Sequence, residues 1–128
     1  MGLPVVHFEI AGSDAERLRD FYGSLFKWEF DTDSPVPPEI SRPGNYGFVT
    51  RYATDDGAGI PGGIGGGPGY HGHVLFYVGV PDVATALQEA GALGGKRVLG
   101  PLRNPSGQVV IGHFLDPEGH LMGVAGPK

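Results

Sequence analysis

Two histidines, each near the start of a short apolar segment, have the clearest chemical potential in this chain. His7 lies in Val6-His7-Phe8-Glu9-Ile10, and His73 opens His73-Val74-Leu75-Phe76-Tyr77-Val78. Imidazole ligates metals and titrates near neutral pH, so each histidine could hold a metal or transfer a proton. The two similar segments predict a duplicated fold around one site.

Glu9 is the carboxylate closest to His7 in the sequence. Residues two apart on a strand share a face, so Glu9 is expected beside His7. The two residues are roughly 6.5 to 7 Å apart along a strand, so a metal shared by His7, Glu9 and His73 needs bent rotamers. The alternative is that His7 is a cavity-wall histidine, hydrogen-bonded to Glu9 or to a neighbouring strand.

Each histidine segment leads into an amphipathic helix. Ser13-Asp14-Ala15-Glu16 has the pattern of a capping box with Ser13 as the N-cap. Asp82 is the expected cap of the second helix, which ends among the glycines 91–95. The first helix is expected to cover a sheet or another helix with one apolar face, formed by Leu18, Phe21, Tyr22, Leu25 and Phe26.

Short β-type segments follow each helix, so each half of the chain is predicted to be β-α-β-β-β. The segments are residues 28–30, 46–52 and 60–64, then 97–99, 108–115 and 120–124. Asn104–Gly107 and Asp116–Gly119 have the pattern of type I turns and predict antiparallel neighbours. Residues 31–45 contain four prolines and predict an ordered surface loop, either a lid or a connector.

The composition limits the possible functions. A chain of 128 residues fits one domain, and it contains no cysteine, which excludes disulfides and thiolate chemistry. The formal net charge of −5, with scattered basic residues, argues against nucleic acid and anionic membranes as partners. No membrane span or targeting segment is evident, which predicts a cytoplasmic protein.

Gly57–Gly62 matches a dinucleotide fingerprint, but Pro61 and further glycines replace the helix that such a site needs.

The ordered set of motifs resembles the vicinal oxygen chelate superfamily, which includes glyoxalases, bleomycin-resistance proteins and extradiol dioxygenases. The resemblance rests on His7-Phe8-Glu9-Ile10, Phe26-Lys27-Trp28, the segment after His73 and Asp116-Pro117-Glu118-Gly119-His120. It implies an α+β fold with one domain over residues 1–128. Two βαβββ modules, about 4–66 and 71–126, would form an incomplete curved barrel around a cavity, and a homodimer is expected. Lys27 stands where relatives have glycine, which predicts strain if the position needs a positive φ.

The resemblance also implies where a metal would be held. Metal-dependent relatives take two ligands from each module, and His7 and His73 match one ligand in each. The usual glutamate near the C-terminus falls at Gly123, and the glycine-rich segment 59–66 contains no carboxylate. Because an open metal site normally needs three protein ligands, these residues predict that the standard site is incomplete.

Four other residues are candidates for the site. His113 matches the position of a catalytic tyrosine in extradiol dioxygenases, so it is either an acid or base or a cavity-lining residue. Tyr77 shares a face with His73 by alternation, and Trp28 offers aromatic surface. Arg51 either pairs with an anionic ligand or is an exposed edge residue.

The sequence therefore predicts a glyoxalase-like, small-molecule-binding protein that lacks a complete metal centre, needs no cofactor and sequesters its ligand. The alternative is a metal-dependent lyase, isomerase or dioxygenase that holds a divalent ion with His7, Glu9 and His73. A further alternative is a metal-free enzyme in which His113 acts as the acid or base.

Overall fold

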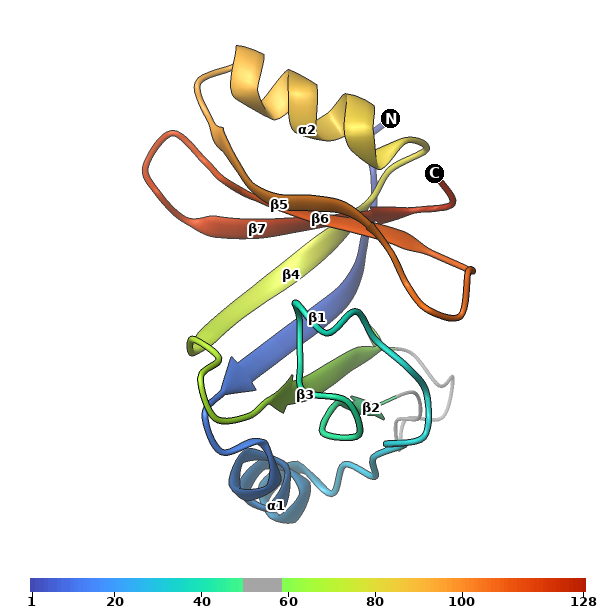
Figure 1. The fold of residues 1–128 in the computed structure, drawn as a ribbon, viewed down its shortest axis with the longest axis vertical. Helices are drawn as coiled ribbons and strands as arrows, with labels where there is room; N and C mark the ends of the chain where they lie inside the picture. Colours follow the sequence, from blue (N-terminus) through green and yellow to red (C-terminus); the bar gives the residue numbers. More distant parts are fainter. Residues whose placement is uncertain (50–58) are drawn as a thin grey trace. The chain divides into compact units, whose positions relative to one another are not determined.

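The chain forms two compact units in the computed structural model, which describes residues 1–49 and 59–128 (Figure 1). The N-terminal unit comprises His7–Val74, and the C-terminal unit comprises Leu75–Lys128 together with Met1–Val6. Strands β1 (Val5–Gly12) and β4 (His73–Gly79) each contribute residues to both units.

The N-terminal unit contains helix α1 (Ala15–Phe26) and the strands β2 (Gly47–Val49) and β3 (Gly62–Gly66) in addition to β1. Strand β3 lies between its neighbours, parallel to β1 and antiparallel to β2. Helix α1 packs against β3. All five residues of β3 are buried and four are glycine, which lets large side chains lie directly across this strand.

The C-terminal unit contains β4, helix α2 (Val83–Ala92) and the strands β5 (Lys96–Arg103), β6 (Val110–Leu115) and β7 (Leu121–Gly126). Strand β7 pairs with β4 in parallel and with β6 in antiparallel fashion, and β6 pairs with β5. Helix α2 covers β5, β6 and β7 (Figure 1). The core of this unit consists of Val80, Val83, Leu87, Val110 and Val124.

The two units repeat the same strand pairing, which confirms the predicted α+β class and the duplication. In one unit Ile64 pairs with Ile10 of β1 and with Gly47 of β2. In the other, Val124 pairs with Val78 of β4 and with Gly112 of β6. The helix caps Asp14 and Asp82 each lie four residues after these β1 and β4 residues, so Ile10 and Val78 are equivalent positions.

This register corrects the matching of the two histidines. Counting back three residues from Ile10 and from Val78 makes Leu75, not His73, the counterpart of His7. The sequence contains the same information, because Asp14 follows His7 by seven residues whereas Asp82 follows His73 by nine. Both aspartates are helix caps, so the caps define the repeat and the histidines do not.

Helix α1 differs from the prediction at its start and on its apolar face. Asp14, not Ser13, is the N-cap, and its carboxylate accepts a hydrogen bond from the backbone N–H of Arg17. Ala15 is the buried residue of the helix, whereas Phe21, Leu25 and Phe26 are more than half exposed. The covered face of α1 is therefore the one with Ala15, on which Leu18 and Tyr22 are half-buried.

Lys27 ends α1 in the left-handed conformation, with φ 62°, so the position at which relatives have glycine does take a positive φ in this chain. The predicted strand 28–30 does not form. Within the described residues, the only β pairing near this segment is the isolated bridge between Asp31 and Phe48. The Asp31 carboxylate accepts hydrogen bonds from the Asp33 backbone and the Ser34 hydroxyl, and this turn ends the pairing.

The segment 31–45 is anchored to β3. The Ser41 hydroxyl accepts a hydrogen bond from the Gly66 backbone N–H, and the Arg42 N–H donates to the Gly66 carbonyl. Ile40 and Ser41 are buried. These contacts favour the connector over the lid.

Strand β4 alternates between buried and exposed residues. Leu75 and Tyr77 are buried, whereas Val74 and Phe76 are 73% and 42% exposed. Helix α2 packs on β5, β6 and β7, so it covers the end of β4 near Val78 and leaves these two residues uncovered.

Candidate functional site

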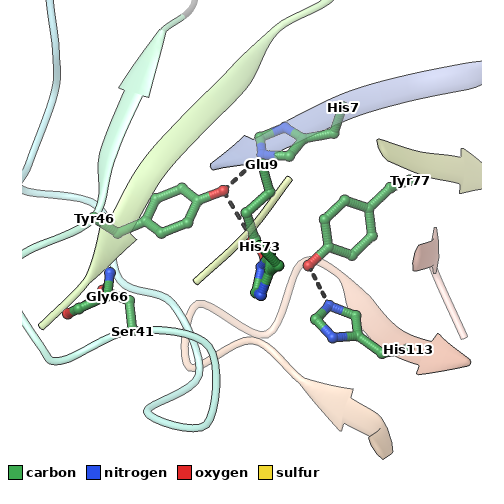
Figure 2. Close-up of polar contacts among 8 residues, drawn as sticks. All are labelled: His7, Glu9, Ser41, Tyr46, Gly66, His73, Tyr77 and His113. Atoms are coloured by element: carbon green, nitrogen blue, oxygen red, sulfur yellow. Dashed lines mark hydrogen bonds and ion pairs between the residues drawn. The ribbon is translucent and has the colours of Figure 1, made fainter. Parts of the chain in front are cut away.

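A chain of four hydrogen-bonded side chains lies within the N-terminal unit (Figure 2). The Tyr46 hydroxyl is 3.0 Å from His7 Nε2 and donates to Glu9 Oε1 at 3.1 Å. The other carboxylate oxygen, Glu9 Oε2, is 2.7 Å from His73 Nε2. Glu9 is 1% exposed and is thus held by partners on both oxygens inside the unit.

The direction of each hydrogen bond in this chain follows from the inventory of donors. The Tyr46 hydroxyl gives its single hydrogen to Glu9, so its oxygen must accept from His7 Nε2. A carboxylate has no hydrogen to give, so His73 Nε2 also donates. Both imidazoles therefore donate through Nε2, in the neutral or the charged state.

Burial lowers the pKa of His7 below its usual 6.5, because desolvation disfavours the charged imidazolium. The nearby Glu9 carboxylate acts in the opposite direction and raises the pKa by a smaller amount. The neutral form of His7 is thus favoured in the folded protein, in agreement with its role as a donor to the Tyr46 hydroxyl.

A pocket of about 700 Å³ lies beside this chain, at the start of α1. The sheet side is formed by the end of β1 and by Gly72, His73 and Val74. Its remaining walls include Leu18, Phe21, Tyr22 and Tyr70. The Tyr70 hydroxyl donates to the Pro38 carbonyl, so the anchored loop fixes this wall. The His73 side chain is 19% exposed and connects the pocket to Glu9.

Two of the positions at which the resemblance places metal ligands, Gly123 and the strand β3, have no donor side chain. Gly123 has no donor side chain, and a Cβ there would lie 2.4 Å from the Tyr77 ring. In the N-terminal unit, a Cβ at the equivalent Gly63 would lie 1.9 Å from the Tyr46 ring. Tyrosine rings thus occupy the space that ligand side chains would need.

In the alternative set of His7, Glu9 and His73, both Nε2 atoms contact protein oxygens, so a metal at Nε2 would have to replace these hydrogen bonds. Among residues 1–49 and 59–128, no three His, Asp or Glu side chains are grouped in a way that could hold a metal ion.

The C-terminal unit contains a second polar pair. The Tyr77 hydroxyl lies 2.7 Å from His113 Nε2, and both residues are 3% exposed. Tyr77 and His113 both pair with Gly123 of β7, so the missing side chain of Gly123 makes room for the tyrosine. These two predicted site residues are therefore brought together.

Other predicted residues lie elsewhere or outside the described part of the chain. Trp28 packs against the rings of Phe8, Tyr22 and Phe26 and does not line the pocket. Arg51 lies outside the described residues. His120 is exposed and contacts Asp116 at 2.9 Å.

Sequence reasoning missed Tyr46 as a member of the polar chain. The signal that could have indicated it is the glycine-rich strand, because glycines at 63 and 65 leave space for one large side chain on that face. No helix among the described residues is both long and apolar enough to cross a membrane.

Comparisons with known proteins give the family and the fold of this chain. The family described as Glyoxalase/Bleomycin resistance protein/Dioxygenase superfamily matches residues 5–124. No curated protein is similar enough in sequence to count as a match. A Streptomyces coelicolor methylmalonyl-CoA epimerase, solved with 2-nitronate-propionyl-CoA, has a TM-score of 0.68 and 18% identity, covering 98% of this chain and 95% of that one.

Two further solved structures share the fold. A hypothetical protein from Bacillus halodurans gives a TM-score of 0.66 at 13% identity, with coverage of 100% of this chain and 96% of the other. The methylmalonyl-CoA epimerase from Mycobacterium tuberculosis gives 0.59 at 12% identity, with coverage of 97% and 87%. At these identities the similarity extends to the fold alone.

Proposed function

Because the chain belongs to the glyoxalase, bleomycin resistance protein and dioxygenase superfamily, we propose that it binds a small molecule and does so without a resident metal ion. The observation that carries the proposal is the pocket of about 700 Å³ whose wall contains His73, backed by the buried Glu9. Pockets of this size, mostly apolar with a few fixed polar groups, are typical of small-molecule sites.

The tyrosine rings over Gly63 and Gly123 support the metal-free part of the proposal. Elemental analysis of protein purified without chelator tests it. We expect far less than one divalent ion per chain. A tightly held stoichiometric ion that is lost in His7→Ala and His73→Ala variants would overturn this part and favour the metal-dependent enzyme.

Binding itself is tested by thermal shift with a panel of aromatic and acyl compounds. The panel includes acyl-CoA esters, since epimerases of this fold bind such compounds. Phe21 lines the pocket, whereas Leu25, one turn further along α1 and equally exposed, does not. We expect Phe21→Lys to abolish the stabilisation by a bound compound and Leu25→Lys to retain it. Equal effects of the two variants would place binding elsewhere.

A second function, acid–base catalysis, is favoured by the contact between Glu9 and His73. A buried carboxylate that orients a partly exposed imidazole is the arrangement found in many general bases. Proton exchange of carbonyl compounds in D₂O, followed by NMR, tests this function. Exchange should disappear in a His73→Gln variant, and the absence of any exchange above buffer would rule the function out.

His113, beside Tyr77, stays a prediction as an acid or base.

We also infer, from the resemblance, a homodimer that sequesters its ligand in the cytoplasm. Sedimentation at micromolar concentration tests the dimer, and a monomer at all concentrations would contradict it.

A further inference from the structure

We infer that the pocket takes an aromatic molecule with one carboxylate group, and that the Arg17 guanidinium binds this carboxylate. The inference rests on the proposed function, because it names the class of molecule that the same pocket binds. Two observations carry it. One is the set of charges in the pocket wall, and the other is an arginine at a helix position that helix stability does not explain.

The pocket wall contains one permanent positive charge, as far as the described residues form it. Arg17 belongs to this wall and is exposed. Its backbone N–H donates to Asp14, but its guanidinium has no hydrogen-bond or ion-pair partner among residues 1–49 and 59–128. The guanidinium offers five N–H donors in a planar fork that suits a carboxylate. These donors are therefore available to a ligand in the pocket.

The position of Arg17 in α1 is unfavourable for the helix itself. Asp14 is the N-cap, so Arg17 is the third residue of the helix and lies in its first turn. The helix dipole puts partial positive charge at this end and disfavours a cation there. A glutamate or glutamine at the third position would also reach back to the backbone N–H of the N-cap. Arg17 thus breaks a local rule without a stabilising contact in the described chain, which is the pattern expected at functional sites.

A carboxylate in the wall favours a ligand with a single negative charge. Asp14 is held beside Arg17, because its side chain accepts a hydrogen bond from the Arg17 backbone N–H at 3.1 Å. This anion repels each negative charge that a ligand brings. One carboxylate therefore suits the pocket better than a phosphate group, whose charge approaches −2 near neutral pH.

The aromatic part of the wall favours a flat ring in the ligand. The rings of Phe21 and Tyr22, both on α1, meet edge to face at 5.1 Å. Tyr70 comes from the segment before β4, and its hydroxyl donates to the Pro38 carbonyl, which fixes this ring. Phe21 follows Arg17 by four residues, so the two side chains are neighbours on one face of the helix. A ligand ring that contacts Phe21 therefore has an attached carboxylate within reach of the guanidinium.

The test compares 2-naphthoate with 2-naphthamide, which share the ring system and differ in charge. In titrations at about pH 7, where carboxylic acids are ionised, 2-naphthoate should bind the wild-type protein about 3- to 5-fold more tightly, as one exposed charge pair allows. The preference should shrink at about 0.5 M salt, which screens the pair. It should vanish in Arg17→Gln. It should persist in Lys27→Gln, which removes a charge about 15 Å away along the same helix and outside the pocket.

Two measurements separate ligand binding from helix stability. Without any ligand, Arg17→Gln should unfold at the same temperature as the wild type or a higher one, because glutamine suits the first turn better than a cation. A lower unfolding temperature would show that Arg17 has a structural role and would contradict the inference. Asp14→Asn keeps a good N-cap and removes the opposing anion, so it should strengthen the preference for 2-naphthoate.

The outcomes distinguish this inference from the proposed function. Equal binding of 2-naphthoate and 2-naphthamide to the wild type would overturn the inference and leave the proposed function intact. A preference that survives in Arg17→Gln would exclude Arg17 as the binding group. Tighter binding of 2-naphthyl phosphate than of 2-naphthoate would overturn the choice of a carboxylate. If neither probe nor any compound of the panel binds, the proposed function fails as well.

Discussion

At the scale of single residues, two tyrosines whose rings lie over glycines fix the polar groups of the two units. Tyr46 and Tyr77 each lie over a glycine at the same position of the repeat, Gly63 and Gly123. Each hydroxyl then reaches a titratable group, Glu9 in one unit and His113 in the other. The polar groups of both units are thus fixed by hydrogen bonds.

Stability should depend on pH through His7. Its pKa is lowered in the folded state, mainly by burial, so below about 6.5 the unfolded chain binds more protons than the folded chain. The free energy of unfolding should be highest above this pH and should fall as the pH drops toward the lowered pKa. Urea unfolding at several pH values between 5 and 8 measures it. His7→Gln should flatten the curve in this window and His71→Gln should not; identical curves for all three proteins would contradict the assignment.

Gly123→Ala should destabilise the protein by about 1–3 kcal/mol, because the new Cβ overlaps the Tyr77 ring. Gly91→Ala is the matched control, since a Cβ at this position in α2 has no neighbour within 4 Å. That control should be neutral or stabilising by up to about 1 kcal/mol. Chemical denaturation of both variants gives the comparison, and a harmless Gly123→Ala would show that the ring moves aside easily.

At the level of elements, the helix caps define the repeat better than the histidines do. Asp14 and Asp82 each accept a hydrogen bond from the backbone N–H three residues later. Each cap follows a strand of the same pairing pattern, so the start of each helix is tied to the register of its unit.

Replacing the cap of α1 should therefore have a larger effect than replacing its neighbour. Asp14→Ala removes the acceptor for the Arg17 N–H and should cost about 1 kcal/mol of unfolding free energy. Ser13→Ala should leave stability unchanged within error, because Ser13 is not the cap. Thermal unfolding of the two variants checks this prediction. A larger loss of stability for Ser13→Ala than for Asp14→Ala would favour Ser13 as the N-cap.

Helices, strands and turns could be predicted from the sequence where neighbouring residues determine them. The cap of α2 and both proline–glycine turns rest on neighbouring residues, and the structure confirms them. The strand at 28–30 was wrong, because the turn at Asp31 and the left-handed Lys27 leave room for a single bridge. The exposure of Phe21 could not be predicted either, since it depends on which face of α1 packs against β3.

For the whole molecule, the duplication and the fold class could be predicted, but the polar chain could not. His7, Glu9 and His73 were all candidates, yet their link through Tyr46 joins residues 37 positions apart in the sequence. The register that makes Leu75 the counterpart of His7 also depends on strand pairing, although the caps contained a clue.

The net charge of −5 predicts a further property of the whole molecule. Repulsion from phosphates should prevent binding to DNA, because nonspecific binding depends on released counterions. Fluorescence anisotropy with a labelled duplex at 50 mM salt should show no binding at micromolar protein. Binding that weakens steeply with added salt would contradict this expectation.

The tyrosine over Gly123 also limits how this protein can change over evolutionary time. A carboxylate introduced at position 123 collides with the ring of Tyr77, and loss of the ring alone leaves a hole in a buried region. Either first step lowers fitness through stability, so the route to a metal-binding descendant requires both changes together. The pair therefore acts as an epistatic barrier between two chemistries on one scaffold.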